Sequence, residues 1–137
     1  MLREAYIAEV GKLVDPLDCI FVNRGNDSDL SPGDDLFKEF TYYKQMYPSF
    51  PKLSADSHNN IILRIDFERR FRKQITNNKR ALFKLKKISE ASRKQDIYLV
   101  CYEGLTKLCH RRILLRMCAE LFGADVEVRG IEERSLK

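Results

Sequence analysis

Hydrophobic residues along this chain follow two patterns, short continuous runs and positions that recur every three or four residues. The continuous runs over 19–22 and 97–102 are typical of strands that are buried on both faces of a sheet. The recurring pattern predicts four amphipathic helices, over 34–46, 66–77, 79–93 and 109–122. Strands and helices in this arrangement favour an α/β fold.

Shorter apolar patterns predict a strand over 6–10, either a short strand or the lead-in of a helix over 61–65, and a strand over 124–128. The last of these follows Gly123, which is a suitable C-cap for helix 109–122. Strand 97–102, this helix and strand 124–128 then form a βαβ unit with parallel strands and a right-handed crossover. Because both faces of such a sheet must be covered, we predict one α/β domain over 1–137, with three layers and a small, mostly parallel sheet flanked by helices.

Two polar segments follow neither pattern. Residues 52–60 are expected to form a mobile loop, with His58 exposed to solvent. Residues 131–137 are expected to form a tail. Polar connecting segments of this kind usually run over the surface of a domain.

The composition, with 44% hydrophobic and 33% charged residues, is that of a soluble globular protein. The longest apolar runs are too short to span a bilayer, and no apolar signal region follows Met1. We therefore expect a cytoplasmic protein without a membrane partner. No nucleotide-binding glycine motif or other cofactor motif occurs, so no cofactor is expected.

Four cysteines occur, at positions 19, 101, 109 and 118. None forms a C-x-x-C pair, so their spacing predicts neither a metal site nor a disulfide framework. Cys19, Cys101 and Cys118 lie in apolar segments, where cysteine commonly acts as a small hydrophobic residue. Cys109 differs from them because it opens a predicted helix.

Reactive side chains gather where strand 97–102 is followed by a helix. Glu103 ends the strand, and Cys109 and His110 open the helix, at the edge where open α/β sheets bind ligands. Unpaired amides in the first helical turn favour a thiolate, and His110 adds positive charge. Glu103 could accept a proton, and Thr106 is placed to cap the helix. We therefore predict catalytic roles for Glu103, Cys109 and His110.

Arginines near the same junction indicate a second property. The helix start with Arg111 or Arg112 could hold a phosphate or carboxylate, and Arg24 follows the other buried strand. We predict anion binding by Arg111, Arg112 and Arg24, with an unidentified small anionic ligand as the partner. The alternative is an interaction protein without chemistry, in which the cluster only caps a helix.

The net charge of +5 is unevenly distributed. Residues 64–94 contain 12 basic and 3 acidic side chains, a local charge of +9. One interpretation is the solvated face of two helices, balanced by acidic loops of the same domain. The other is a nucleic-acid-binding surface driven by attraction to phosphates. Its contacts would come from Arg69, Arg70, Arg72, Lys73, Lys79, Arg80, Lys84, Lys86 and Lys87.

The strand and helix at the 97–122 junction together resemble the signature of the family catalogued as domain of unknown function 488, including its YeaO-like members. That signature is an apolar strand ending in C-x-E, a short loop, and C-H-R at the start of a helix. The matching residues are Cys101, Glu103, Cys109, His110 and Arg111. The chain departs from the YeaO-like pattern after Arg24, where the usual Trp-Pro is missing. The resemblance implies an α/β domain in a cytosolic prokaryotic protein, and it implies no particular reaction.

Overall fold

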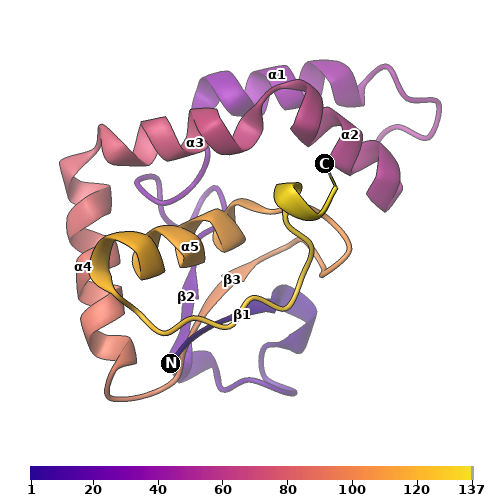
Figure 1. Ribbon diagram of the computed structural model, residues 1–137. Coiled ribbons are helices and arrows are strands. Elements are labelled where there is room, and N and C mark those ends of the chain that lie inside the picture. The colour runs from indigo at the N-terminus through magenta and orange to yellow at the C-terminus, as the bar shows by residue number, and fades with distance from the viewer. Residues whose placement is uncertain (137) are drawn as a thin grey trace.

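The computed structural model describes residues 1–136, and a three-stranded parallel sheet lies at its centre (Figure 1). The strands are β1 (Leu2–Tyr6), β2 (Cys19–Phe21) and β3 (Ile97–Cys101), in the order β1-β3-β2. The central strand β3 pairs with β1 along its whole length and with β2 through residues 98–100. All three strands therefore end at the same edge of the sheet, which confirms the predicted parallel α/β fold.

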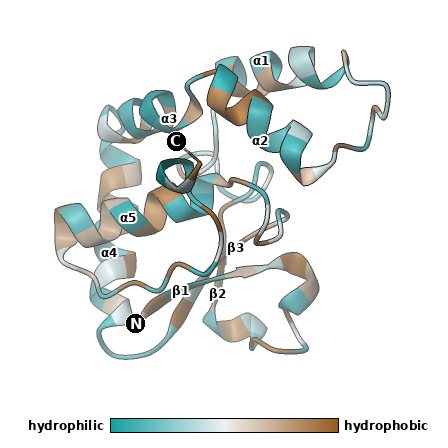
Figure 2. Cartoon of the chain, turned by 45° about the vertical axis from the view of Figure 1, so that its right-hand side comes forward, coloured by the Kyte–Doolittle hydropathy of each residue, from teal (hydrophilic) through white to brown (hydrophobic). Residues whose placement is uncertain are grey.

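Five α-helices complete the fold: α1 (Asp34–Lys44), α2 (Ala55–Arg64), α3 (Phe67–Thr76), α4 (Lys79–Ser92) and α5 (His110–Phe122). Helix α5 packs on β1 and β3, and α4 packs on α5 and β3. Figures 1 and 2 show α1, α2 and α3 on the side of α5 that faces away from the sheet. Among residues 1–136, no helix is both long enough and apolar enough to cross a membrane.

The two faces of the sheet are covered differently. Ile97 and Leu99 of β3 point into the main core with the α-helices, whereas Val100 joins a smaller cluster with Ala5 and Val14. That smaller cluster is covered by the segment between β1 and β2, which contains the short 3-10 helices η1 and η2 over residues 7–9 and 16–18. In Figure 2 the helices alternate between hydrophobic and hydrophilic colours, because each buries one face only.

Both predicted strands at the margins of the sheet are displaced. The strand expected over 6–10 lies at Leu2–Tyr6, because the buried Glu4 belongs to the strand although its charge suggests a surface position. The strand expected over 124–128 is reduced to one parallel bridge between Val126 and Leu2. The segment from β3 through α5 therefore returns to the sheet beside β1 rather than beside β3.

The polar segment 52–60 and the apolar segment 61–65 together contain one helix, α2, so the strand alternative over 61–65 is wrong. Ser54 caps this helix by accepting a hydrogen bond from the Ser57 amide at 3.1 Å. Helix α2 is amphipathic: it buries Ile61 and Ile62 in the main core, and also His58. The expectation of an exposed loop is therefore wrong for residues 55–60.

The predicted tail over 131–137 is packed within the described residues. Ile131 contacts the main core, and Glu133 is buried in the short 3-10 helix η3 (Glu133–Ser135). Lys137 lies outside the described residues. This C-terminal segment lies against the start of α5, where it contributes to the site described next.

Candidate active site

The carboxyl ends of β2 and β3 open into a pocket of about 270 Å³. Its polar lining includes Arg24 after β2, Cys101 and Glu103 at the end of β3, and Cys109 and His110 at the start of α5. Aromatic side chains from α1 and α3 form part of the opposite wall. The residues predicted as catalytic therefore line one pocket, together with one of the three predicted anion-binding arginines.

Cys109 lies at the N-cap of α5, with an extended backbone. Its Sγ atom, the Sγ atom of Cys101 and a ring nitrogen of His110 all lie within 4.8 Å of one another. The distance from Cys109 Sγ to His110 Nδ1 is 3.8 Å. Cys101 is buried in the main core, as expected of a packing residue, and its sulfur also lies beside that of Cys109.

The His110 ring is held from both sides. Its Nε2 atom lies 2.7 Å from the backbone oxygen of Val22, which can only accept a hydrogen bond, so Nε2 carries a proton. Phe71 packs edge-on against the ring at a centroid distance of 5.5 Å. This geometry leaves Nδ1 facing the sulfur of Cys109, where it can accept the thiol proton.

The surroundings of Cys109 favour its thiolate. Burial opposes ionisation, but a hydrogen bond from Cys101 and the positive charges of His110 and Arg111 outweigh it and hold the pKa of Cys109 well below its usual range. The hydrogen bond to Cys109 and burial raise the pKa of Cys101. Burial also raises the pKa of Cys118, to about 11. Cys109 is therefore the thiol that ionises first.

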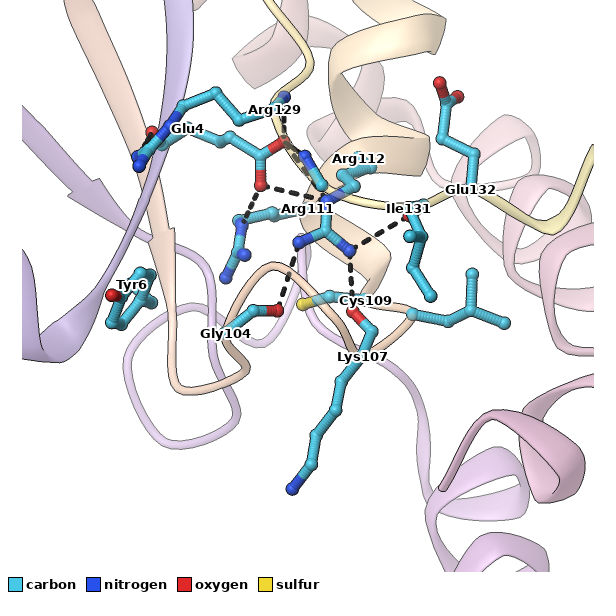
Figure 3. Close-up of polar contacts among 12 residues, drawn as sticks. Glu4, Tyr6, Gly104, Lys107, Cys109, Arg111, Arg112, Arg129, Ile131 and Glu132 are labelled. Carbon is cyan, nitrogen blue, oxygen red and sulfur yellow. Dashed lines mark hydrogen bonds and ion pairs between the residues drawn. The ribbon is translucent and has the colours of Figure 1, made fainter. Parts of the chain in front are cut away.

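A buried cluster of charges lies behind Cys109 (Figure 3). Arg111 Nε donates to Glu4 Oε1 at 2.7 Å, and Arg112 Nε donates to the same oxygen at 3.0 Å. These three side chains are at most 2% exposed. Burial opposes ionisation of Glu4, but the charges of Arg112 and Arg111 lower its pKa. The structure therefore pairs both arginines internally, and neither lines the pocket in which they were predicted to bind an anion.

Arg112 also fixes the backbone around the site. Its guanidinium donates to the carbonyl oxygens of Gly104, Lys107 and Ile131, at 3.1, 2.6 and 3.1 Å. Gly130 passes so close to this guanidinium that a side chain at position 130 would overlap it. The loop before α5 and the C-terminal segment are thus held by one buried side chain.

Helix α2 holds the same loop from the other side. Asn59 accepts a hydrogen bond from the Leu108 amide at 2.7 Å and donates to the Thr106 carbonyl at 3.0 Å. His58 Nε2 donates to the Leu108 carbonyl at 2.9 Å. His58 is therefore buried rather than exposed, and Thr106 contributes its carbonyl to α2 instead of capping α5 as predicted. Ser54 is a residue type that favours helix N-caps, and this signal could have predicted α2 and placed His58 and Asn59 on it.

Glu103 and Arg24 lie at the rim of the pocket. Glu103 is about one-third exposed, and its carboxylate lies 3.9 Å from Lys107 Nζ. Arg24 donates to the Pro32 carbonyl at 2.7 Å and to Asp34 at 3.0 Å. Its guanidinium also lies over the ring of Phe37, 4.2 Å from the centroid. Both side chains remain accessible to a molecule in the pocket.

The sulfur atoms and imidazole of Cys101, Cys109 and His110 have the chemistry of metal ligands. The Arg111 charge acts on the same sulfur and opposes a divalent cation there. Because the buried arginines outnumber their carboxylate partner, the electrostatics favour an anion at this position. The thiolate of Cys109 is such an anion.

Most of the basic residues predicted to bind nucleic acid take part in ion pairs. Arg70 lies 2.6 Å from Glu39, Arg72 lies 2.8 Å from Glu120, and Lys84 lies 3.0 Å from Asp27. Further pairs join Arg69 to Asp66, Arg80 to Asp29 and Lys87 to Glu90. Within residues 1–136, Lys73, Lys79 and Lys86 have no carboxylate at ion-pair distance. This pattern supports the interpretation of a solvated helical face, and nucleic-acid binding stays a prediction.

Comparison with known proteins gave one family match. A family model described as the active DUF488-N3 subclade matches residues 27–121. The matched region includes the end of β3, the following loop and most of α5, and thus the pocket residues Glu103, Cys109 and His110. No curated protein and no solved structure matches the chain.

Proposed function

The chain belongs to the DUF488 family, in its N3 subclade, and we propose that it is an enzyme that uses Cys109 as a nucleophile. The observation that carries this proposal is the position of the Cys109 sulfur. It lies at the start of a helix, in a pocket, beside the imidazole of His110 and in front of a buried arginine. The family description calls the subclade active, which agrees with an enzymatic role.

The proposed reaction has two steps. First, the Cys109 thiolate forms a bond to an electrophilic centre of the substrate, while the bond to the leaving group breaks and its electron pair departs with that group. Next, Glu103 accepts a proton from water, and the hydroxide formed displaces the sulfur. Protonated Glu103 then gives its proton to the leaving group. The sum is hydrolysis of the substrate, and both the thiolate and the carboxylate are regenerated.

The pocket also supports a class of substrate. Its wall is mainly apolar, whereas Arg24 and the first turn of α5 bring positive charge to its polar end. We propose a small substrate with an apolar body and one anionic group, which Arg24 would contact at the rim. Since this chemistry needs a reduced thiol, we place the protein in the cytoplasm.

Two alkylating reagents test this proposal. Iodoacetate and iodoacetamide react with the same sulfur, but only iodoacetate is an anion. We compare the rate with iodoacetate divided by the rate with iodoacetamide at Cys109. This ratio should be at least several-fold higher in the folded protein than in urea. Arg24→Gln should lower this ratio, and Arg93→Gln, on the far end of α4, should leave it unchanged. An equal ratio in the folded and unfolded protein would contradict an anion-selective pocket.

A further inference from the structure

The cluster behind Cys109 contains two guanidinium groups and one carboxylate. Arg111 and Arg112 both pair with Glu4, and no second carboxylate of residues 1–136 lies within ion-pair distance of either arginine. The backbone amides of Arg129 and Gly130 also donate to Glu4, at 2.8 and 3.2 Å. The single carboxylate of Glu4 is thus shared by two guanidinium groups and two backbone amides, so the two arginines exceed it by one positive charge.

The two arginines share this excess unequally. Arg112 uses all three of its nitrogen atoms, because it also donates to three backbone carbonyls. Arg111 bonds only through Nε, and its two terminal nitrogens are buried without a hydrogen-bond partner within the described residues. A buried donor without a partner costs about 1–3 kcal/mol, and more when it is charged. An anion near these nitrogens would therefore be stabilised.

The Cys109 sulfur becomes an anion when its thiol ionises. In Figure 3 it points toward the side of α5 on which the Arg111 guanidinium lies. The charge of Arg111 favours ionisation of this thiol. The two terminal nitrogens of Arg111 form no hydrogen bond within the described residues, so they remain available to this anion.

Other charged and titratable groups surround Cys109. On the pocket side they are Cys101, Glu103, His58, His110 and Arg24. On the opposite side, a small cavity of about 20 Å³ is lined by Arg112, Glu68, Glu132 and Glu133. These carboxylates have partners of their own: Arg116 holds Glu132 at 2.7 Å, Arg72 lies 4.0 Å from Glu68, and Glu133 accepts a hydrogen bond from the Glu68 amide. Behind the sheet-facing side of Arg111, Glu4 pairs with its Nε atom, and Arg129 holds Glu9, whose pKa the charge of Arg111 also lowers. The two terminal nitrogens of Arg111 are left without a hydrogen-bond partner among residues 1–136.

We propose that Arg111 is a positioning residue whose counter-ion is the Cys109 thiolate. This inference rests on the proposed nucleophilic role of Cys109. In the first step, loss of the sulfur's negative charge leaves Arg111 without its anion. In the second step, departure of the product restores that anion. Arg111 thus stabilises the thiolate before it attacks the substrate. It also stabilises the thiolate when the sulfur is released in the second step.

The test is the pH dependence of Cys109 alkylation by iodoacetamide in the full-length chain. Arg111→Met should move the midpoint up by about one pH unit and slow alkylation near pH 7 about tenfold. Arg111→Lys, which keeps the charge, should move it less. Arg93→Gln is the control, since this arginine lies at the C-cap of α4, bonds to the Phe122 carbonyl and should leave the midpoint unchanged.

The outcomes separate this inference from the proposed function. A low midpoint in the wild type that Arg111→Met leaves unchanged would overturn the role of Arg111 and leave the nucleophile intact. An ordinary midpoint in the wild type would overturn the proposed function itself.

A second comparison applies if Arg111→Met does not fold. Cys109→Asp and Cys109→Asn differ only in charge, and the aspartate should raise the melting temperature at pH 7 by about 3 °C relative to the asparagine. Ser54→Asp and Ser54→Asn, at the N-cap of α2, measure the effect of a helix start alone. An Asp–Asn difference at position 109 no larger than that at position 54 would overturn the proposal.

Discussion

Two regions of this chain are rich in positive charge, and they differ in how that charge is balanced. On the exposed face of α3 and α4, Arg70 and Lys84 pair with acidic residues of other segments. At the start of α5, two buried arginines share the single carboxylate of Glu4. Ion pairs therefore occupy most of the basic side chains of α3 and α4, and the charges that remain there are exposed to solvent, whereas the excess charge of the smaller cluster is buried. Partners and burial decide where an anion is favoured.

The largest effect is expected from Glu4→Gln. It leaves two buried guanidinium groups without a carboxylate, and removing one partner of such a group costs about 3–5 kcal/mol. Urea unfolding should show a loss of this size in the free energy of unfolding. Glu90→Gln, which removes the exposed partner of Lys87, should change it by less than about 1 kcal/mol. Equal effects would contradict the distinction between the two regions.

Asn59→Ala should have the second largest effect. It leaves the buried amide of Leu108 without its acceptor, at a cost of about 1–3 kcal/mol, and loosens the loop that precedes Cys109. We expect lower stability in urea and a changed rate of Cys109 alkylation. Asn60→Ala alters the exposed neighbour on the same helix and serves as the control. If both variants behave alike, α2 does not hold the loop.

The thiolate of Cys109 should make stability depend on pH. Its pKa is lower in the folded chain than in the unfolded chain, so the gain is complete above the ordinary pKa of about 8.5 and is lost as pH falls through the folded value. The melting temperature of the wild type should therefore rise relative to that of Cys109→Ser between pH 5 and pH 9. Cys118, whose pKa is raised to about 11, should show no such rise, and the wild type should lose stability relative to Cys118→Ser only above about pH 8.5. A constant difference for Cys109→Ser would indicate a neutral thiol.

The smallest effect is expected at the basic face. With Lys73, Lys79 and Lys86 as its unpaired charges, a plot of log affinity for duplex DNA against log salt should have a slope no steeper than about −3. Binding should therefore be weak near physiological salt. A slope near −8 would mean that the ion pairs open to release their arginines, and it would favour the nucleic-acid-binding function.

Sequence patterns predicted the central elements of the fold well, for clear physical reasons. The apolar run of β3 and the helical spacing of α5 follow directly from burial, and Gly123 ends α5 in the left-handed conformation expected of a C-cap. Strand β1 was misplaced because Glu4 is a buried charge. Helix α2 was missed because His58 and Asn59 are polar residues that bind a loop inside the protein.

The candidate site could be predicted only in part. Glu103, Cys109 and His110 were identified because reactive residue types follow one another at a strand-to-helix junction. The burial of Arg111 and Arg112 could not be predicted, because their partner Glu4 lies more than 100 positions away in the sequence. Charged side chains normally lie at the surface, and here Glu4, Arg111 and Arg112 are buried together behind Cys109.

The measurement that tests the central claim most directly is the rate of iodoacetamide labelling of each cysteine against pH, read peptide by peptide by mass spectrometry. We predict that Cys109 is labelled with a midpoint well below the ordinary thiol value of about 8.5, while Cys19, Cys101 and Cys118 stay unlabelled until the pH is higher. A Cys109 midpoint equal to that of the urea-unfolded chain would contradict the account.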